Sequence, residues 1–187
     1  MSKKSTQAKI AQCRIILLKR YPTYWKMPTP ERLVLACSVI VNDYKVREKT
    51  GRNDGEWVAA FLDQSAGLPE GYAWCASMID FACEVAGIAY GPFPAAAVIQ
   101  WTHWGKANHR IVKTPVRGAL AFKMFTGTTG HIGCVTSEDV AMHTVSTLEG
   151  NTSAGSAGSQ RDGGGAYKRI RPATFWDGYI VMSENGK

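Results

Sequence analysis

Residues 71–87 read GYAWCASMIDFACEVAG, in which an aromatic tetrapeptide leads into an apolar segment that ends at a glycine. The pattern predicts a helix from about Cys75 to Gly87, because glycine adopts the left-handed conformation that closes many helices. A cysteine at a helix start is either a buried core residue or a nucleophile, whose thiolate the helix dipole stabilises. The second interpretation requires a base elsewhere in the chain and a group that orients that base.

The first half of the chain carries helical patterns. Apolar residues recur at helical spacing over residues 6–20, and Thr29 followed by Pro30 and Glu31 is typical of a helix start. A further short helix is predicted within residues 55–67, which end in a glycine. Three helices are therefore expected before the one that carries Cys75.

The second half changes to short segments that are rich in β-forming residues and separated by glycine or charged turns. The predicted strands are residues 118–125, 130–138, 140–151 and 165–172. Helices followed by strands indicate an α+β fold, with N-terminal helices packed on a C-terminal antiparallel β-sheet. Residues 152–166 are almost entirely Gly, Ser, Ala and polar, which predicts a mobile loop between two strands.

The N-terminal residues are expected to form a helical extension, residues 1–28, ahead of one domain, residues 29–187. The apolar run at residues 15–18 is too short for the core of a secretory signal. No apolar run approaches the roughly 18 residues needed to span a bilayer. We therefore expect synthesis in the cytoplasm without a signal peptide.

The chain has a formal net charge of +7 and five cysteines. An anionic surface and simple solubility explain the charge better than nucleic acid does, because the basic residues are scattered and no nucleic-acid motif accompanies them. An odd cysteine count without C-x-x-C spacing argues against disulfides and zinc, so free thiols are expected. No HExxH motif is present, and we expect neither a metal nor a cofactor.

The candidate base is His131, which opens the predicted strand at residues 130–138. A side chain at a strand end can reach a cleft, whereas strand alternation places Cys134 on the opposite face. His143 is expected within a strand, and His103 and His109 in an irregular, tryptophan-rich region. A satisfied or solvated histidine is the alternative interpretation of His131.

The candidate orienting group lies in the sequence TLEGN, where Glu149 and Asn151 are two residues apart. If this stretch is extended, both side chains point to one face of the sheet. Either could accept the imidazole N–H and leave the other ring nitrogen for a thiol. The alternative is an ordinary turn that leads into the loop at residues 152–166.

Four stretches follow one another in the order EKTGRNDGEWVAAFL, YAWCASMIDFACEVAG, RGALAFKMFTGTTGHIGCV and TLEGNTS. In sequence and order they resemble the CHAP family, the cysteine, histidine-dependent amidohydrolases and peptidases of bacteria and their phages. The resemblance covers roughly residues 45–172, and residues 1–28 match nothing in that family. It implies a papain-like version of the α+β fold and hydrolysis of an amide bond in peptidoglycan.

The resemblance implies that Cys75 is the nucleophile and His131 the base, with Glu149 and Asn151 completing the catalytic set. Of the last two, we expect Asn151 to orient the imidazole and Glu149 to support the site electrostatically. The candidate walls of a substrate groove are aromatic, with core packing as the alternative. These residues are Tyr72, Trp74, Trp101 and Trp104.

Two departures from the family pattern are visible. Residues 118–119 are Gly-Ala where the family usually has Gly-Asp, which puts in doubt any role of that acid. Residues 42–55 lack the alternating acidic ligands of the calcium loop found in some phage members. The implied enzyme therefore works without a calcium ion.

The implied partner is bacterial peptidoglycan, with an anionic wall or outer-membrane surface as a possible attraction for the basic chain. No nucleic-acid partner is expected, and the protein is expected to be a monomer. The first interpretation is a phage-type lysin that acts on the cell wall or in the periplasm after release by another protein. The alternatives are a delivered antibacterial effector with the same chemistry and a non-catalytic wall-binding module. The sequence fits both an N-acetylmuramoyl-L-alanine amidase and a peptide endopeptidase.

Overall fold

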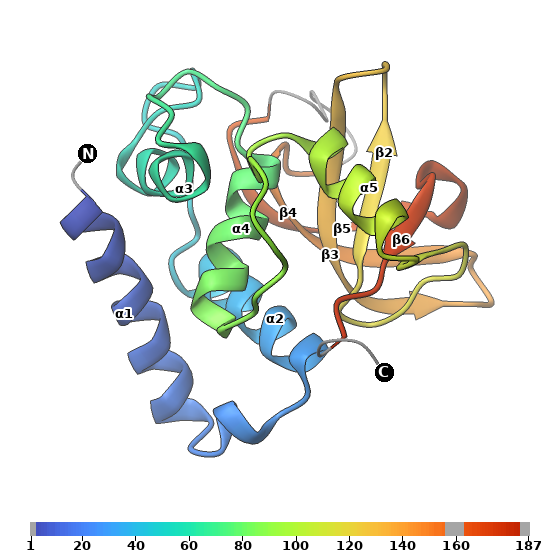
Figure 1. The fold of residues 1–187 in the computed structure, drawn as a ribbon, viewed down its shortest axis with the longest axis horizontal. Coiled ribbons are helices and arrows are strands. Elements are labelled where there is room, and N and C mark those ends of the chain that lie inside the picture. The colour runs from blue at the N-terminus through green and yellow to red at the C-terminus, as the bar shows by residue number, and fades with distance from the viewer. Residues whose placement is uncertain (1–2, 156–162, 184–187) are drawn as a thin grey trace.

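The computed structural model describes residues 3–155 and 163–183, which form a helical layer and a six-stranded sheet (Figure 1). The helices are α1 (Lys3–Arg20), α2 (Thr29–Ser38), α3 (Glu56–Ala66), α4 (Cys75–Ala86) and α5 (Val98–Ala107). Short helical turns occupy Tyr24–Lys26, Val39–Asp43 and Ala173–Phe175. The strands are β1 (Ile111–Val112), β2 (Leu120–Met124), β3 (Gly130–Asp139), β4 (Thr144–Thr152), β5 (Gly165–Pro172) and β6 (Gly178–Ile180).

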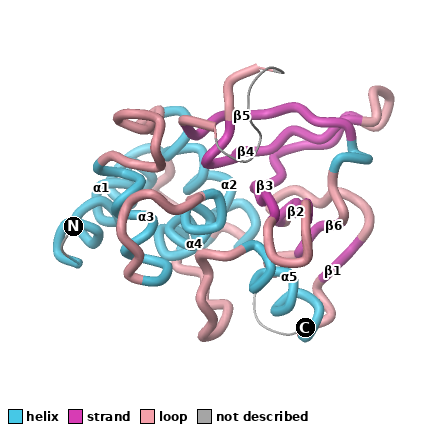
Figure 2. The backbone as a smooth tube through the Cα atoms, turned by 90° about the horizontal axis from the view of Figure 1, so that it is seen from above, coloured by secondary structure: helices cyan, strands magenta, loops and turns pink. Residues whose placement is uncertain are grey.

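The sheet has the order β1-β6-β2-β3-β4-β5, and each neighbouring pair is antiparallel. Strands β2 to β5 form a meander, whereas β6 inserts between β1 and β2. Helices α1 to α4 gather on one side of the molecule and the strands on the other, whereas α5 lies against the sheet (Figure 2). This arrangement confirms the predicted α+β class with an antiparallel sheet.

Helix α4 lies at the centre of the core, where it packs against α2 and α3 and against strands β3 and β4. It is buried along almost its whole length because its residues are apolar or small. Glycines end α3 and α4 as predicted, since Gly67 and Gly87 adopt φ values of 61° and 65°. Helix α4 thus ends at Gly87, after packing along the sheet through β3 and β4.

Helix α1 belongs to the same hydrophobic core as the rest of the chain. Its residues Ile10, Cys13 and Leu17 are at most 1% exposed and pack in the cluster that includes α4. Thr6 also donates a hydrogen bond of 2.6 Å to Asp63 on α3. Helix α1, which was expected to belong to an N-terminal extension, therefore packs against the rest of the described fold.

Several elements differ from the sequence prediction. The tryptophan-rich region that was expected to be irregular forms α5, which carries His103. His143 lies in the turn between β3 and β4 with φ of 49°, not within a strand. Strands β1 and β6 were not predicted, because two and three residues are too few for a periodic pattern.

The predicted loop at residues 152–166 is shorter than expected. Strand β4 continues through Thr152, and β5 begins at Gly165. Residues 156–162, on which most of the loop prediction falls, lie outside the described residues. Within the described part of the chain, no helix has the length and apolar content needed to cross a bilayer.

Candidate active site

Cys75 is the first residue of α4, and Trp74 occupies the N-cap position. The Trp74 side chain makes no capping hydrogen bond, which leaves the first backbone N–H groups of α4 for an anion or a polarised carbonyl. The Cys75 side chain is largely buried, with 5% of the residue exposed. It is nevertheless accessible from one side, because it lines a cleft.

The cleft has a volume of about 490 Å³ and lies where three loops meet at the start of α4. The loop before α4 supplies Leu68, Tyr72 and Ala73, the connection into α5 supplies residues 96–98, and the connection from β2 to β3 supplies residues 128–130. Every residue that lines the cleft is uncharged. The nucleophile candidate therefore faces a neutral, mostly apolar space.

His131 lies near the start of β3 and is fully buried. Its Nε2 atom is 2.8 Å from Oε2 of Glu149 on β4, and no partner reaches its Nδ1 atom among the described residues. The Cys75 thiol is close enough to raise the pKa of this ring, although no hydrogen bond joins them in this conformation. Nδ1 is thus the ring nitrogen left for proton exchange with Cys75.

Glu149 is held by three side chains at once. Arg171 on β5 donates from Nε to Oε1 at 2.8 Å and from Nη2 to Oε2 at 2.5 Å. Thr147 donates a further hydrogen bond of 2.5 Å to Oε1. Such a bidentate arginine–carboxylate pair fixes the carboxylate in one plane, which in turn fixes the His131 ring.

These contacts determine the charge states of the buried pair. Burial alone would lower the pKa of His131, but the Cys75 thiol and the Glu149 carboxylate raise this pKa to about 9. Burial alone would raise the pKa of Glu149, whereas hydrogen bonds from Arg171 and His131 lower it to about 2. At neutral pH the site therefore holds an imidazolium beside a carboxylate.

Two glycines allow the strands to bring these groups together. Gly133 pairs with Glu149 across the β3–β4 ladder, and a Cβ atom at Gly133 would lie 2.6 Å from Cγ of Glu149. The missing side chain therefore leaves room for Glu149 to extend toward His131. A Cβ atom at Gly150 would lie 2.7 Å from the Trp74 ring, so this glycine lets β4 approach the start of α4.

Aromatic rings cover the polar site. Trp176 stacks near His131 with ring centroids 6.3 Å apart. The Arg171 guanidinium lies 4.5 Å from the Phe175 ring centroid and 5.7 Å from that of Trp176. Exclusion of water strengthens the hydrogen bonds of Glu149, because electrostatic interactions grow in a low-dielectric environment.

Cys75, His131 and Glu149 of the predicted catalytic set lie close together in the structure. The side chain that is hydrogen-bonded to His131 is Glu149. This corrects the expectation that Asn151 would orient the imidazole. Asn151 is fully buried at the end of β4 with φ of 53°, a conformation that asparagine tolerates better than most residues. The pairing of β4 with β5 is irregular between Glu149 and Thr152, so Glu149 is paired with both neighbouring strands whereas Asn151 lies in the irregular stretch.

The aromatic residues expected at a groove separate into two groups. Tyr72 is 54% exposed and lines the cleft beside Cys75. Trp74 and Trp101 are fully buried, so the expectation that they face a substrate is wrong for this conformation. Trp104 lines a different cavity, together with Arg110 at the far end of α5.

Arg171 was not identified from the sequence. The run Lys168–Arg171 suggests an apolar residue between exposed arginines, but the structure has the opposite arrangement. Ile170 is 67% exposed, whereas Arg169 and Arg171 are 8% and 5% exposed. The only sequence signal was that Arg169 and Arg171 are two residues apart and so share one face of a strand. Because arginine is usually exposed, the pattern alone places that face in solvent.

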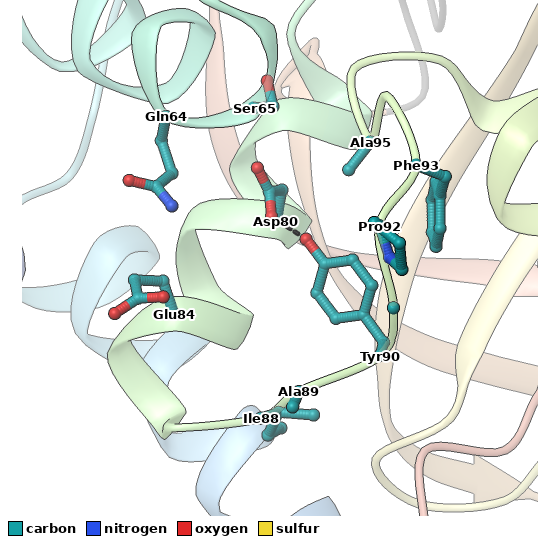
Figure 3. A pocket seen from close by; sticks show the side chains of 11 residues that line it. Gln64, Ser65, Asp80, Glu84, Ile88, Ala89, Tyr90, Pro92, Phe93 and Ala95 are labelled. Atoms are coloured by element: carbon teal, nitrogen blue, oxygen red, sulfur yellow. Dashed lines mark hydrogen bonds between the residues drawn. The ribbon is translucent and has the colours of Figure 1, made fainter.

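A second cavity, of about 320 Å³, lies along the opposite end of α4 (Figure 3). It contains Asp80, whose carboxylate accepts a hydrogen bond from Tyr90, and Glu84 lies one turn farther along the helix. Burial raises the pKa of Asp80 to about 7, with a smaller contribution from the charge of Glu84. Neither Cys75 nor His131 lines this cavity, so it is separate from the candidate active site.

Family models, curated proteins and solved structures were compared with the chain, and none of them matches it. Within residues 3–155 and 163–183, no group of three or more His, Cys, Asp or Glu side chains could hold a metal ion. What the site can do chemically therefore follows from its own geometry.

Proposed function

We propose that the chain is a cysteine-dependent hydrolase that cleaves an amide bond in bacterial peptidoglycan. One observation carries the proposal: a thiol at an uncapped helix start lies beside a buried histidine that a buried carboxylate holds. A nucleophile, a base and an orienting group in this order constitute the arrangement of a cysteine hydrolase. The α+β arrangement is compatible with a papain-like fold.

In the proposed reaction, the Cys75 proton resides on His131 and the thiolate attacks the carbonyl carbon of the amide. The oxyanion that forms accepts hydrogen bonds from backbone N–H groups at the start of α4. The imidazolium then protonates the amide nitrogen, the C–N bond breaks, and an acyl-thioester remains on Cys75. Water gives a proton to His131 as its oxygen attacks the thioester, which releases the acid and restores the thiolate.

Two features support peptidoglycan as the substrate. The resemblance of the four sequence stretches to the CHAP family points to this polymer. The net charge of +7 favours approach to an anionic cell wall by long-range attraction, which salt weakens. The neutral cleft beside Cys75 suits a small uncharged group, such as an alanyl or lactyl unit, on the acyl side of the bond.

The test uses Cys75→Ala with Cys83→Ala as the matched control on the same helix. Cys83 is fully buried and burial raises its pKa well above the usual value, so it cannot serve as the nucleophile. We expect Cys75→Ala to lower the clearing of purified peptidoglycan suspensions by about a thousandfold or more, with Cys83→Ala near wild type. Mass spectrometry of the products identifies the bond. Equal clearing by Cys75→Ala and wild type contradicts the proposal.

A further inference from the structure

The Trp74 side chain is fully buried directly before the nucleophile candidate, and its indole makes one directed contact. Nε1 donates a hydrogen bond of 2.9 Å to Oε1 of Glu48. Buried indole N–H groups need such a partner, and a carboxylate is a strong one. The partner lies 26 residues earlier, in the loop between α2 and α3.

The same indole is also in contact with the strand that carries the orienting carboxylate. Atoms Cζ3 and Cε3 of Trp74 lie so close to Gly150 that a Cβ atom there would be 2.7 and 3.0 Å away. Trp74 is therefore joined through the chain to Cys75 and packs against Gly150, the chain neighbour of Glu149. The position of one ring affects the separation of the two halves of the site.

Glu48 is itself fixed from two further directions. Its Oε2 atom accepts a hydrogen bond of 2.9 Å from the Asn53 backbone N–H. Its own backbone N–H donates to the Gly164 carbonyl at 3.0 Å, just before β5. The Asn53 carbonyl accepts from the Gly71 N–H at 2.9 Å, in the loop before Cys75. The loop thus connects the start of β5 with the start of α4.

We propose that Glu48 is a positioning residue for the hydrolase proposed above, on whose catalytic set this inference rests. By holding the Trp74 indole against Gly150, Glu48 sets the distance between the Cys75 thiol and the His131–Glu149 pair. It does not contact the reacting atoms. Its effect is on the geometry and proton exchange of the site, not on binding in the cleft, because Glu48 and Trp74 do not line the cleft.

Both side-chain oxygens of Glu48 are used, which allows a substitution of equal size to test them. Both carboxylate oxygens accept an N–H group, one from Trp74 and one from Asn53. Glutamine has only one side-chain oxygen, so Glu48→Gln must lose one of these bonds even though its size is unchanged. Trp74→Phe removes the same bond from the other side and keeps a ring against Gly150. A misplacement of about 1 Å at a catalytic group can lower a rate by about a hundredfold.

The experiment compares Glu48→Gln, Trp74→Phe and the double variant in two assays. The first is the pH dependence of Cys75 alkylation by iodoacetamide, which needs no substrate. The second is clearing of purified peptidoglycan, analysed as kcat and KM. We expect each single variant to lower kcat by about 10- to 100-fold with KM within twofold, and to change the alkylation pH profile. The kcat of the double variant should be no lower than that of the less active single variant, because both substitutions act on the same Trp74–Glu48 hydrogen bond.

Tyr24→Phe is the matched control, because it also removes one hydrogen bond of a buried aromatic residue. The Tyr24 hydroxyl donates to the Arg32 carbonyl at 2.9 Å in the connection between α1 and α2. We expect a similar fall in Tm with kcat and the alkylation profile unchanged. Should Trp74→Phe fail to fold, Glu48→Gln tests the same hydrogen bond at its other partner, which is only half-buried.

If Glu48→Gln lowers Tm like the control but keeps the wild-type kcat and alkylation profile, the positioning role is refuted. Cys75→Ala is measured in parallel. An inactive Cys75→Ala with an unaffected Glu48→Gln refutes the inference alone, whereas an active Cys75→Ala refutes the proposed hydrolase itself.

Discussion

Glu149 accepts hydrogen bonds from His131, Arg171 and Thr147 while it is fully buried. A buried carboxylate is costly unless it is paired, and here the charge of Glu149 is compensated by both His131 and Arg171. The raised pKa of His131 stabilises the fold fully below pH 6.5, and this contribution is lost as the pH rises through about 9. One residue therefore links the stability of the fold to the protonation of the base.

Glu149→Gln should lower activity and change its pH dependence. The carboxylate raises the pKa of His131, so the neutral amide should let the imidazolium lose its proton at a lower pH. The wild-type rate should fall above about pH 9, and this alkaline limb should move to lower pH in the variant. We expect kcat to fall by about a hundredfold, which a pH–rate profile from pH 5 to 10 measures.

The matched control at this scale is Glu138→Gln, which makes the same charge change at an exposed position of β3. Its profile should coincide with that of the wild type. An alkaline limb that stays near pH 9 in Glu149→Gln would mean that Glu149 does not control the base.

At the scale of the element, the pairing of β3 with β4 places Glu149 opposite a residue without a side chain. Gly133→Ala introduces a Cβ atom 2.6 Å from Cγ of Glu149, so the carboxylate must move away from His131. We expect a loss of about 1–3 kcal/mol in unfolding free energy and a fall in kcat of at least about a hundredfold. Chemical denaturation and the clearing assay measure the two effects.

Gly127→Ala is the comparison for this change, because a Cβ atom there meets nothing within 4 Å. It should leave both stability and activity near wild type. A Gly133→Ala variant with wild-type activity would show that Glu149 can reach His131 by another route.

The elements that carry the site were predictable from sequence to different extents. The start of α4 and strands β3 and β4 were visible, because glycine punctuation and period-two alternation extend over enough residues there. Helix α5 was missed since Ala97 at its N-cap provides no capping side chain and its residues include several aromatics. The burial of Arg171 was not predictable, because it depends on Glu149 from a neighbouring strand.

At the scale of the molecule, the helical layer and the sheet are expected to unfold together. Ile10 on α1 is 1% exposed and packs in the core that includes α4, whereas Ile15 on the same helix is 65% exposed. Ile10→Ala should cost about 2–5 kcal/mol of unfolding free energy, and Ile15→Ala about 0.5 kcal/mol or less. Denaturation followed by fluorescence and by circular dichroism measures both variants.

Coincident transitions by the two probes would establish one cooperative unit. If Ile10→Ala instead produced an early transition of α1 alone, residues 1–28 would behave as the separate extension that the sequence suggested. Sequence patterns could not decide this point, because an amphipathic helix shows that it has an apolar face but not which surface covers that face.

Strand β6 follows the other five described strands along the chain, yet it lies in the sheet between β1 and β2. Protein synthesis is directional, so β1 and β2 leave the ribosome with no partner between them and must wait for residues 178–180. A message cut short before this point encodes the thiol, the histidine and the carboxylate but leaves a gap inside the sheet. The order of translation therefore delays completion of the sheet until residues 178–180 have been made.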